Sequence, residues 1–260
     1  MPLRLSRAAR RRALPVATVA GMVGLMALGA CAYNEALGRN QLILADDQAI
    51  SAQSNAAWTE LLRTETVSTN AAQNQRVRTV GQRVVQAAGM GNRTWEYAVF
   101  VGESPNAFTL PTGQIGVTTG MLSLVQNDDQ LAAVIGHEIA HVVARHAQER
   151  YSQTAASSLA VQAGQGLVGS DYAQIAGMIG SAGAQFGVLL PFSRNHELEA
   201  DRLGVDYLAA AGYRPSESIA LWQLMGQQRQ NSVPQFASTH PSDSTRIEQL
   251  REYIASRGWS

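Results

Sequence analysis

Two histidines and a glutamate lie close together in an apolar stretch of the chain, residues 132–146 (AAVIGHEIAHVVARH). His137 and His141 are four residues apart, so in a helix they lie about 40° apart around the axis and can share a metal ion. Glu138 lies about 100° from His137 and can reach a water at the metal rather than the metal itself. This HExxH pattern is typical of zinc hydrolases, in which zinc lowers the pKa of water to about 7 and the glutamate accepts its proton. The alternative is a pair of histidines that meets the pattern by chance.

A catalytic zinc ion needs a third protein ligand and an open fourth position. One known arrangement places a glycine and a histidine three and six residues after the second histidine, where this chain has Ala144 and Ala147. His146 lies about 140° from His141 on the same helix and cannot join the site through that helix. We therefore expect His146 to be a structural or surface histidine.

A second helix, predicted over residues 193–212, offers the missing ligand. Glu197 and Asp201 lie on one stripe of this helix, and the stripe continues into Gly204, Val205 and Leu208. Two acids at the head of an apolar stripe are costly to bury unless a cation meets them. We predict that Glu197 is the third zinc ligand and that Asp201 accepts a hydrogen bond from the distal nitrogen of a ligating histidine.

The same helix carries a polar stripe formed by Glu199, Arg202 and Asp206, which we expect to be solvated. The alternative reading of Glu197 and Asp201 is that they too are ordinary solvated acids.

Composition limits the class of protein. The chain has 260 residues, of which 45% are apolar and 15% charged, so it can form a sizeable core. All of its basic side chains are arginines, which excludes lysine chemistry such as Schiff bases or a Walker-type phosphate loop. Five arginines fall within residues 1–30, and the remaining chain has an excess of acidic residues, so nucleic acid is a poor candidate partner.

The N-terminal residues 1–30 have the layout of an export signal, with a basic stretch that ends at Arg12 and an uncharged apolar stretch after it. The sequence LGAC at residues 28–31 is similar to a lipobox, and Cys31 is the chain's one cysteine. We predict a lipoprotein signal peptide, lipidation of Cys31, and a short tether over residues 31–45. Ala32 favours the outer membrane, by resemblance to lipoprotein sorting. The alternative is an uncleaved membrane anchor.

The remaining residues, 46–260, are predicted to form one domain of α+β class, mostly helical. Apolar spacing predicts helices over residues 46–68, 74–89, 128–150, 193–212 and 215–230 and near the C-terminus, and strands over residues 95–102 and within 106–120. The segment 151–192 is rich in glycine and alanine and has one charge, Asp171. We expect it to be mobile or to contact the membrane.

Three sequence segments together carry a family resemblance. HEIAH, SRNHELEAD and STHPSDSTRI occur in this order, and the chain resembles the zinc metallopeptidases that include the CAAX prenyl proteases and the heat-shock protease HtpX, closest to their periplasmic lipoprotein and BepA-like branch. The resemblance covers residues 74–258. NAFTLPTGQIGVTTG is similar to another segment of that family, from which Thr109 and Thr112 depart.

The resemblance implies a gluzincin fold, with the active-site helix packed beside a small β-sheet, and one Zn²⁺ held by His137, His141 and Glu197 with Glu138 as the base. It also implies a role for His240 and Arg246, which lie in the matching HP…R segment. His240 would stabilise the oxyanion or act as an inhibitory fourth ligand. The alternative for His240 is a loop histidine that caps a turn.

The predicted function is that of a lipid-anchored zinc endopeptidase of the bacterial envelope, facing the periplasm. Its expected substrates, misfolded or stalled envelope proteins, follow from the resemblance alone. A peptide substrate would bind as an added strand along residues 106–117, for which the candidates are Asn106, Phe108, Gly113 and Ile115. The alternatives are an assembly protein with a structural or self-inhibited zinc site, and a membrane-embedded prenyl-protein protease. The oligomeric state is left open.

Overall fold

The computed structural model of the chain describes residues 31–164, 192–228, 235–240 and 244–259. The predicted signal peptide, residues 1–30, and most of the glycine- and alanine-rich segment, residues 151–192, lie outside the described residues. In chain order the elements are β1 (Cys31–Asn34), β2 (Arg39–Leu42), α2 (Asp47–Thr64), α3 (Ala71–Ala87), β3 (Glu96–Phe100), β4 (Ala107–Thr109), β5 (Gln114–Thr118), α4 (Thr119–Leu124), α5 (Asp128–Val143), α6 (His146–Gly164), α8 (Arg194–Ala210), α9 (Glu217–Gln228), α10 (Gln235–Thr239) and α11 (Ser244–Ser256).

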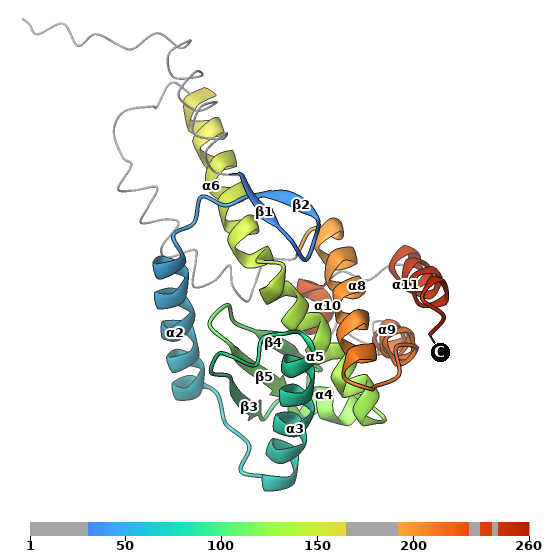
Figure 1. Cartoon of the computed structure of the whole chain (residues 1–260). Coiled ribbons are helices and arrows are strands. Elements are labelled where there is room, and N and C mark those ends of the chain that lie inside the picture. The colour runs from blue at the N-terminus through green and yellow to red at the C-terminus, as the bar shows by residue number, and fades with distance from the viewer. Residues whose placement is uncertain (1–30, 165–191, 229–234, 241–243, 260) are drawn as a thin grey trace, which may run out of the picture.

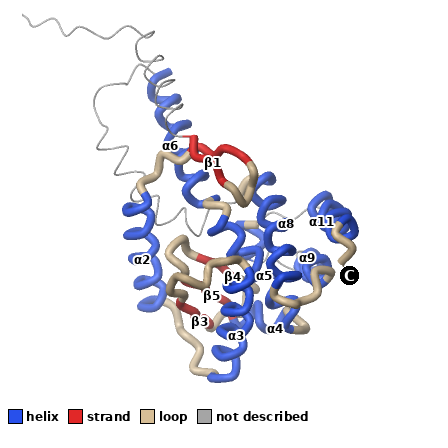
Figure 2. The backbone as a smooth tube through the Cα atoms, in the orientation of Figure 1, coloured by secondary structure: helices blue, strands red, loops and turns tan. Residues whose placement is uncertain are grey.

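A small three-stranded sheet lies between α2 on one face and α3 and α5 on the other (Figure 1). The strand order is β3-β5-β4, with β3 parallel and β4 antiparallel to β5. The predicted α+β class, mostly helical with the HExxH helix beside a small sheet, is confirmed. Figure 2 shows how much of the described chain is helical.

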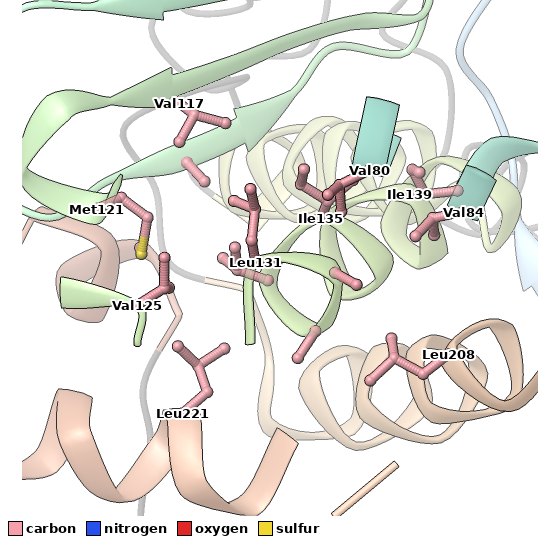
Figure 3. Packing of buried hydrophobic residues seen from close by; sticks show 14 of the residues in the cluster. Val80, Val84, Val117, Met121, Val125, Leu131, Ile135, Ile139, Leu208 and Leu221 are labelled. Atoms are coloured by element: carbon pink, nitrogen blue, oxygen red, sulfur yellow. The ribbon is translucent and has the colours of Figure 1, made fainter. Parts of the chain in front are cut away.

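Strand alternation explains why both faces of the sheet are covered. Along β3, Val99 joins the main core under α3 and α5, while Ala98 and Phe100 join a smaller cluster with Trp58 of α2. On β5, Val117 points into the main core beside Leu131 and Ile135 of α5 (Figure 3). The predicted strands therefore form the layer against which the HExxH helix packs.

Helix α5 lies at the centre of the molecule and contacts α3, α8, α9 and β4. Its side chains Leu131, Ile135 and Ile139 are fully buried. Leu208 of α8 and Leu221 of α9 pack on the side of α5 away from the sheet (Figure 3). None of the helices that the structure describes combines the length and the apolar composition that a membrane span requires.

A pair of glycines brings α5 and α8 close together. A Cβ atom on Gly204 would lie 3.1 Å from the backbone nitrogen of His137, and one on Gly136 would lie 2.9 Å from Leu208 Cδ1. The contact at Gly204 is with backbone atoms, which cannot move aside easily, whereas Leu208 could shift to admit a Cβ at Gly136, so Gly204 is the glycine on which this close crossing depends. The close approach places the first turns of α8 beside the histidines of α5.

The prediction of one continuous helix over residues 128–150 was wrong. Helix α5 ends at Val143, and Arg145 adopts a left-handed conformation with φ 54°. A new helix, α6, then begins at His146. The left-handed residue turns the chain, so the angular relation of a continuous helix does not apply between His141 and His146.

The predicted tether over residues 31–45 was also wrong. Residues of β1 and β2 form an antiparallel hairpin packed against the end of α5. Asn34 Nδ2 donates to the carbonyl oxygen of Val143 at 3.4 Å, and Gln41 Nε2 donates to that of Ala144 at 2.7 Å. The hairpin thus satisfies carbonyl groups that a helix leaves unpaired at its C-terminus.

Candidate metal centre

Four buried side chains from three parts of the chain meet at one point. They are His137 and His141 of α5, Glu197 of α8, and His240 directly after α10, and one ligand atom from each lies within 4.8 Å of all the others. His137 Nε2 lies 3.1 Å from His141 Nε2 and 3.4 Å from Glu197 Oε2. The structure therefore brings together the three residues predicted as ligands.

The spacing of these atoms fits a zinc ion. Tetrahedral zinc with nitrogen and oxygen ligands at its usual distances places neighbouring ligand atoms about 3.3 Å apart. Besides the two distances above, His141 Nε2 lies 3.5 Å from Glu197 Oε1. Two imidazoles and one carboxylate are also a donor set that catalytic zinc uses.

Asp201 lies where the sequence predicted it, one turn beyond Glu197. Its Oδ1 lies 3.0 Å from Nδ1 of His137, the nitrogen that faces away from the ligand atoms. Arg246 of α11 holds the same carboxylate, with Nε donating to Oδ2 at 2.8 Å and Nη2 to Oδ1 at 2.7 Å. Arg246 Nη1 also lies 2.6 Å from Glu197 Oε2, so one guanidinium serves both acids.

Burial and charge shift the pKa values of this group in different directions. Burial lowers the pKa of His141 well below its ordinary value, which keeps the imidazole neutral. Burial also opposes the charge on Glu197, but His240 and Arg246 lower the pKa of this carboxyl well below its usual range. Burial opposes the charge on His137 as well, but Asp201 and Glu197 raise its pKa to about 9.

Glu138 is buried beside the ligands without being one of them. Its Oε2 accepts a hydrogen bond from the backbone nitrogen of Thr109 at 3.2 Å, and its Oε1 lies 3.2 Å from His240 Nε2. Burial raises the pKa of the Glu138 carboxyl, which makes it a stronger proton acceptor. This is the position and environment expected of a general base.

His240 lies inside the site rather than on an exposed loop. Its side chain is 3% exposed, and the ring stacks on Phe236 with centroids 4.4 Å apart. Its Nδ1 is 3.2 Å from His137 Nε2 and 3.0 Å from Glu197 Oε1. The alternative of a loop histidine that caps a turn does not describe this position, because the ring completes the buried side of the site.

A cleft leads to these residues along strand β4. It is lined by Ala107, Thr109, Glu138, His141, Phe192 and His240, among others. Phe192 covers one side of His141, with ring centroids 3.9 Å apart, and the Arg150 guanidinium lies 4.2 Å from the Phe192 ring centroid. Neither Phe192 nor Arg150 was among the predicted site residues.

The structure changes the candidates for strand addition. Strand β5 is central, so Ile115 is fully buried and Gly113 lies in the turn before it, at φ 98°. The Phe108 ring packs directly over Gly116, where there is no room for a Cβ atom, and it lies on the side of the sheet that faces α2. Asn106 and Phe108 line the cleft, but Ile115 and Gly113 do not. The free edge belongs to β4, and by strand alternation the backbones of Ala107 and Thr109 face outward.

One expectation about polar residues near the site was wrong. Glu199 is not on a solvated face: Arg39 Nε and Nη2 donate to its carboxylate at 2.5 and 2.7 Å, and its side chain is 21% exposed. Of the two roles expected for His146, structural or surface, the structure shows the first: the side chain is fully buried, with Nδ1 3.0 Å from His141 Nδ1. It remains outside the group of metal-binding atoms, as expected.

Several polar residues around the site were not predicted from the sequence. Arg39, Gln41 and Glu149 form a buried or half-buried network beside His146 and His196. Although partial burial opposes the charge, Arg39 and His146 lower the pKa of the Glu199 carboxyl to about 2. No local spacing pattern links these residues, because Arg39 is far from Glu149 and Glu199 in the sequence.

Comparisons with known proteins agree with this geometry. The chain is similar to the mitochondrial metalloendopeptidase OMA1 of Schizosaccharomyces pombe, with 36% identity over 175 residues that cover 66% of this chain and 50% of that protein. It is 29% identical to the human metalloendopeptidase OMA1 over 84% of this chain and 44% of that protein. It is also 29% identical to the beta-barrel assembly-enhancing protease of Escherichia coli strain K12, over 68% of this chain and 38% of that protein.

This chain spans half or less of the length of these relatives. The S. pombe protein is more similar to it than the beta-barrel assembly-enhancing protease is, so the motifs identify the family but not the BepA-like branch. The model of peptidase family M48 matches residues 71–254, from the start of α3 almost to the end of α11, and this stretch holds every residue of the metal centre. The chain belongs to peptidase family M48.

Proposed function

We propose that this chain is a zinc-dependent endopeptidase. The observation that carries the proposal is the convergence of His137, His141 and Glu197 with Glu138 at the base of a cleft beside a free strand edge. Zinc, when bound, would polarise a peptide carbonyl and make a water at the site easier to deprotonate. Glu138 would take the proton from that water at the oxygen that faces His240.

The strand edge explains how a peptide would be held. Antiparallel or parallel addition to β4 needs outward-facing backbone groups, which Ala107 and the carbonyl group of Thr109 supply. The Thr109 backbone nitrogen already donates to Glu138, so a peptide strand on this edge would pass within reach of the base. An extended segment of an unfolded protein fits this mode better than a folded surface does.

His240 supports control of the site by the chain itself. Its Nδ1 faces the ligand atoms while its Nε2 faces Glu138, so in this position it shields both the fourth metal position and the base. Displacement by substrate would place the imidazole where it could donate to the oxyanion. The same observation favours the second candidate function, an assembly protein whose zinc site is held shut.

Metal removal separates these two functions. We expect a chelator to abolish cleavage of casein by the purified chain and one equivalent of zinc to restore it, because each ligand residue is positioned for one ion. The measurement is peptide release against zinc content. A chain that binds zinc tightly and releases no peptide under any condition would contradict the endopeptidase and favour the assembly protein.

We further propose that the chain is anchored by a lipid on Cys31, faces the periplasm from the outer membrane, and acts on misfolded or stalled envelope proteins. The support is the LGAC sequence after a basic and an apolar stretch, together with similarity to an E. coli protein named for beta-barrel assembly. Cys31 is exposed at the start of β1, where a lipid would not disturb the core.

The anchor gives a direct test. We expect Cys31→Ser to abolish incorporation of labelled fatty acid and to shift the protein to its uncleaved size, because the sulfur that carries the lipid is gone. Ala32→Ser, at the next residue, is the matched control and should retain the label. Equal labelling of Cys31→Ser and the parent chain would refute the anchor without touching the peptidase proposal.

A further inference from the structure

All five histidines of the chain lie in one continuous cluster, although the metal site uses three of them at most. His146 lies between His141 and His196, with its ring stacked on that of His196 at a centroid distance of 4.4 Å. It is fully buried, although neither the catalytic base nor any ligand requires an imidazole there. Its hydrogen bonds show what it does.

The chemistry of the metal site fixes the direction of those bonds. If Nε2 of His141 binds the metal, its Nδ1 carries the proton and must donate. His146 Nδ1, 3.0 Å away, is the acceptor, so the proton of His146 is on Nε2. That nitrogen lies 3.0 Å from Glu199 Oε2, which accepts. Each donor in this series of hydrogen bonds, from His141 to His146 to Glu199, therefore has an acceptor, and the series ends on a carboxylate.

Arg39 of the N-terminal hairpin holds that carboxylate in place. Its Nε and Nη2 donate to Glu199, and its Nη1 and Nη2 donate to Glu149 at 2.8 and 2.9 Å. The remaining Nη1 hydrogen goes to the carbonyl oxygen of Asn40 at 3.2 Å, so all five guanidinium hydrogens are used. A planar fork engaged on both edges fixes the orientation of both acids.

We propose that the hairpin β1–β2 is part of the metal centre, because Arg39, through Glu199 and His146, orients the His141 imidazole toward the metal. His146, Glu199 and Arg39 act through His141 and are positioning residues. Asn34 and Gln41 of the same hairpin bind the last carbonyls of α5, just beyond His141, and so hold the helix as well as the ring. The inference rests on the proposed zinc site.

Zinc affinity of the full-length chain in detergent tests this inference. We expect His146→Leu to weaken zinc binding about 10–100-fold, as loss of a ligand's hydrogen-bonding partner does. His146→Gln should recover most of the affinity, because its amide oxygen can accept from His141. Arg39→Gln should weaken binding in the same direction by a smaller factor, because Glu199 still accepts from His146. The measurement is competition with a chromophoric chelator.

A matched control and a spectrum distinguish positioning from general damage. Asp206 lies on α8 like Glu199, and it accepts a hydrogen bond from the Tyr253 hydroxyl at 2.8 Å, away from the metal. The Asp206→Asn variant should therefore bind zinc as the parent chain does. With cobalt in place of zinc, His146→Leu and Arg39→Gln should shift the visible absorption bands, and Asp206→Asn should not.

Two outcomes overturn the inference. One is parent affinity and an unshifted cobalt spectrum in folded His146→Leu or, should that variant not fold, in Arg39→Gln. The other is an equal loss in Asp206→Asn. A parent chain that binds no zinc would instead refute the proposed function, so the two failures can be told apart.

Discussion

Glu138→Gln is expected to keep zinc bound and to lower peptide hydrolysis by at least about 10²–10⁴-fold, the range typical of a general base. Glutamine has the shape of glutamate, and its amide oxygen can still accept from the Thr109 backbone nitrogen. It cannot take a proton from water at neutral pH. Glu138 is not among the atoms that could hold the metal, so the ligand set is unchanged.

The measurement is kcat/KM on a quenched fluorescent peptide, together with zinc content. Glu60→Gln on α2 is the control, since the Glu60 side chain is 58% exposed and forms an ion pair with Arg63 on the same helix, away from the metal centre. Near-normal turnover in Glu138→Gln would overturn the proposed mechanism. Loss of zinc along with activity would show that Glu138 organises the ligands instead of acting as the base. A zinc-loaded, inactive variant would also retain bound substrates and allow them to be identified.

Features set by one helix could be predicted from the sequence. The four-residue spacing of His137 and His141 determines that they face one side, and the stripe from Glu197 to Leu208 determines which acids are buried. These are angular relations within a helix and need no knowledge of the rest of the fold. They gave three ligands, the base and the partner of His137 in the positions where the structure has them.

Features that depend on a break between two helices, or on partners far apart in the sequence, could not be predicted in this way. Arg145 adopts a left-handed conformation, which cannot be predicted from the sequence when the residue is not glycine. This turn of the backbone directs His146 toward His141. Glu199 looked solvated because its partner, Arg39, lies 160 residues away in the sequence. Burial of a charge depends on such a partner, and helical spacing carries no information about it.

The order of strands was a further limit. The strands predicted over residues 95–102 and within 106–120 agree with β3, β4 and β5, but alternation does not say which strand is central. Ile115 was expected at a free edge and is instead covered on both sides by β3 and β4. The glycine pair Gly136 and Gly204 also has meaning only once α5 and α8 are known to cross there.

Arg246→Met is expected to lower the free energy of unfolding of the metal-free chain by about 3–5 kcal/mol, the usual cost of removing one partner from a buried ion pair. The Arg246 side chain is 1% exposed and holds the carboxylates of Glu197 and Asp201. Methionine fills a similar volume beside Trp222, over which the guanidinium lies at 4.0 Å from the ring centroid. The loss is therefore assigned to the two acids, which among the described residues keep only His137 as a shared cationic partner at 3.4 and 3.0 Å, and not to a cavity.

Urea unfolding in the presence of a chelator measures this loss. Arg251→Met on the same helix is the matched control: Arg251 is 51% exposed and pairs with Glu248, so its removal should cost no more than about 1 kcal/mol. Arg246→Lys should not restore stability, because a single ammonium cannot reach both acids as the guanidinium fork does. Zinc should recover part of the loss, since its charge faces Glu197. Equal stability of Arg246→Met and Arg251→Met would mean that Glu197 and Asp201 are neutral without the metal, and that Arg246 does not balance their charge.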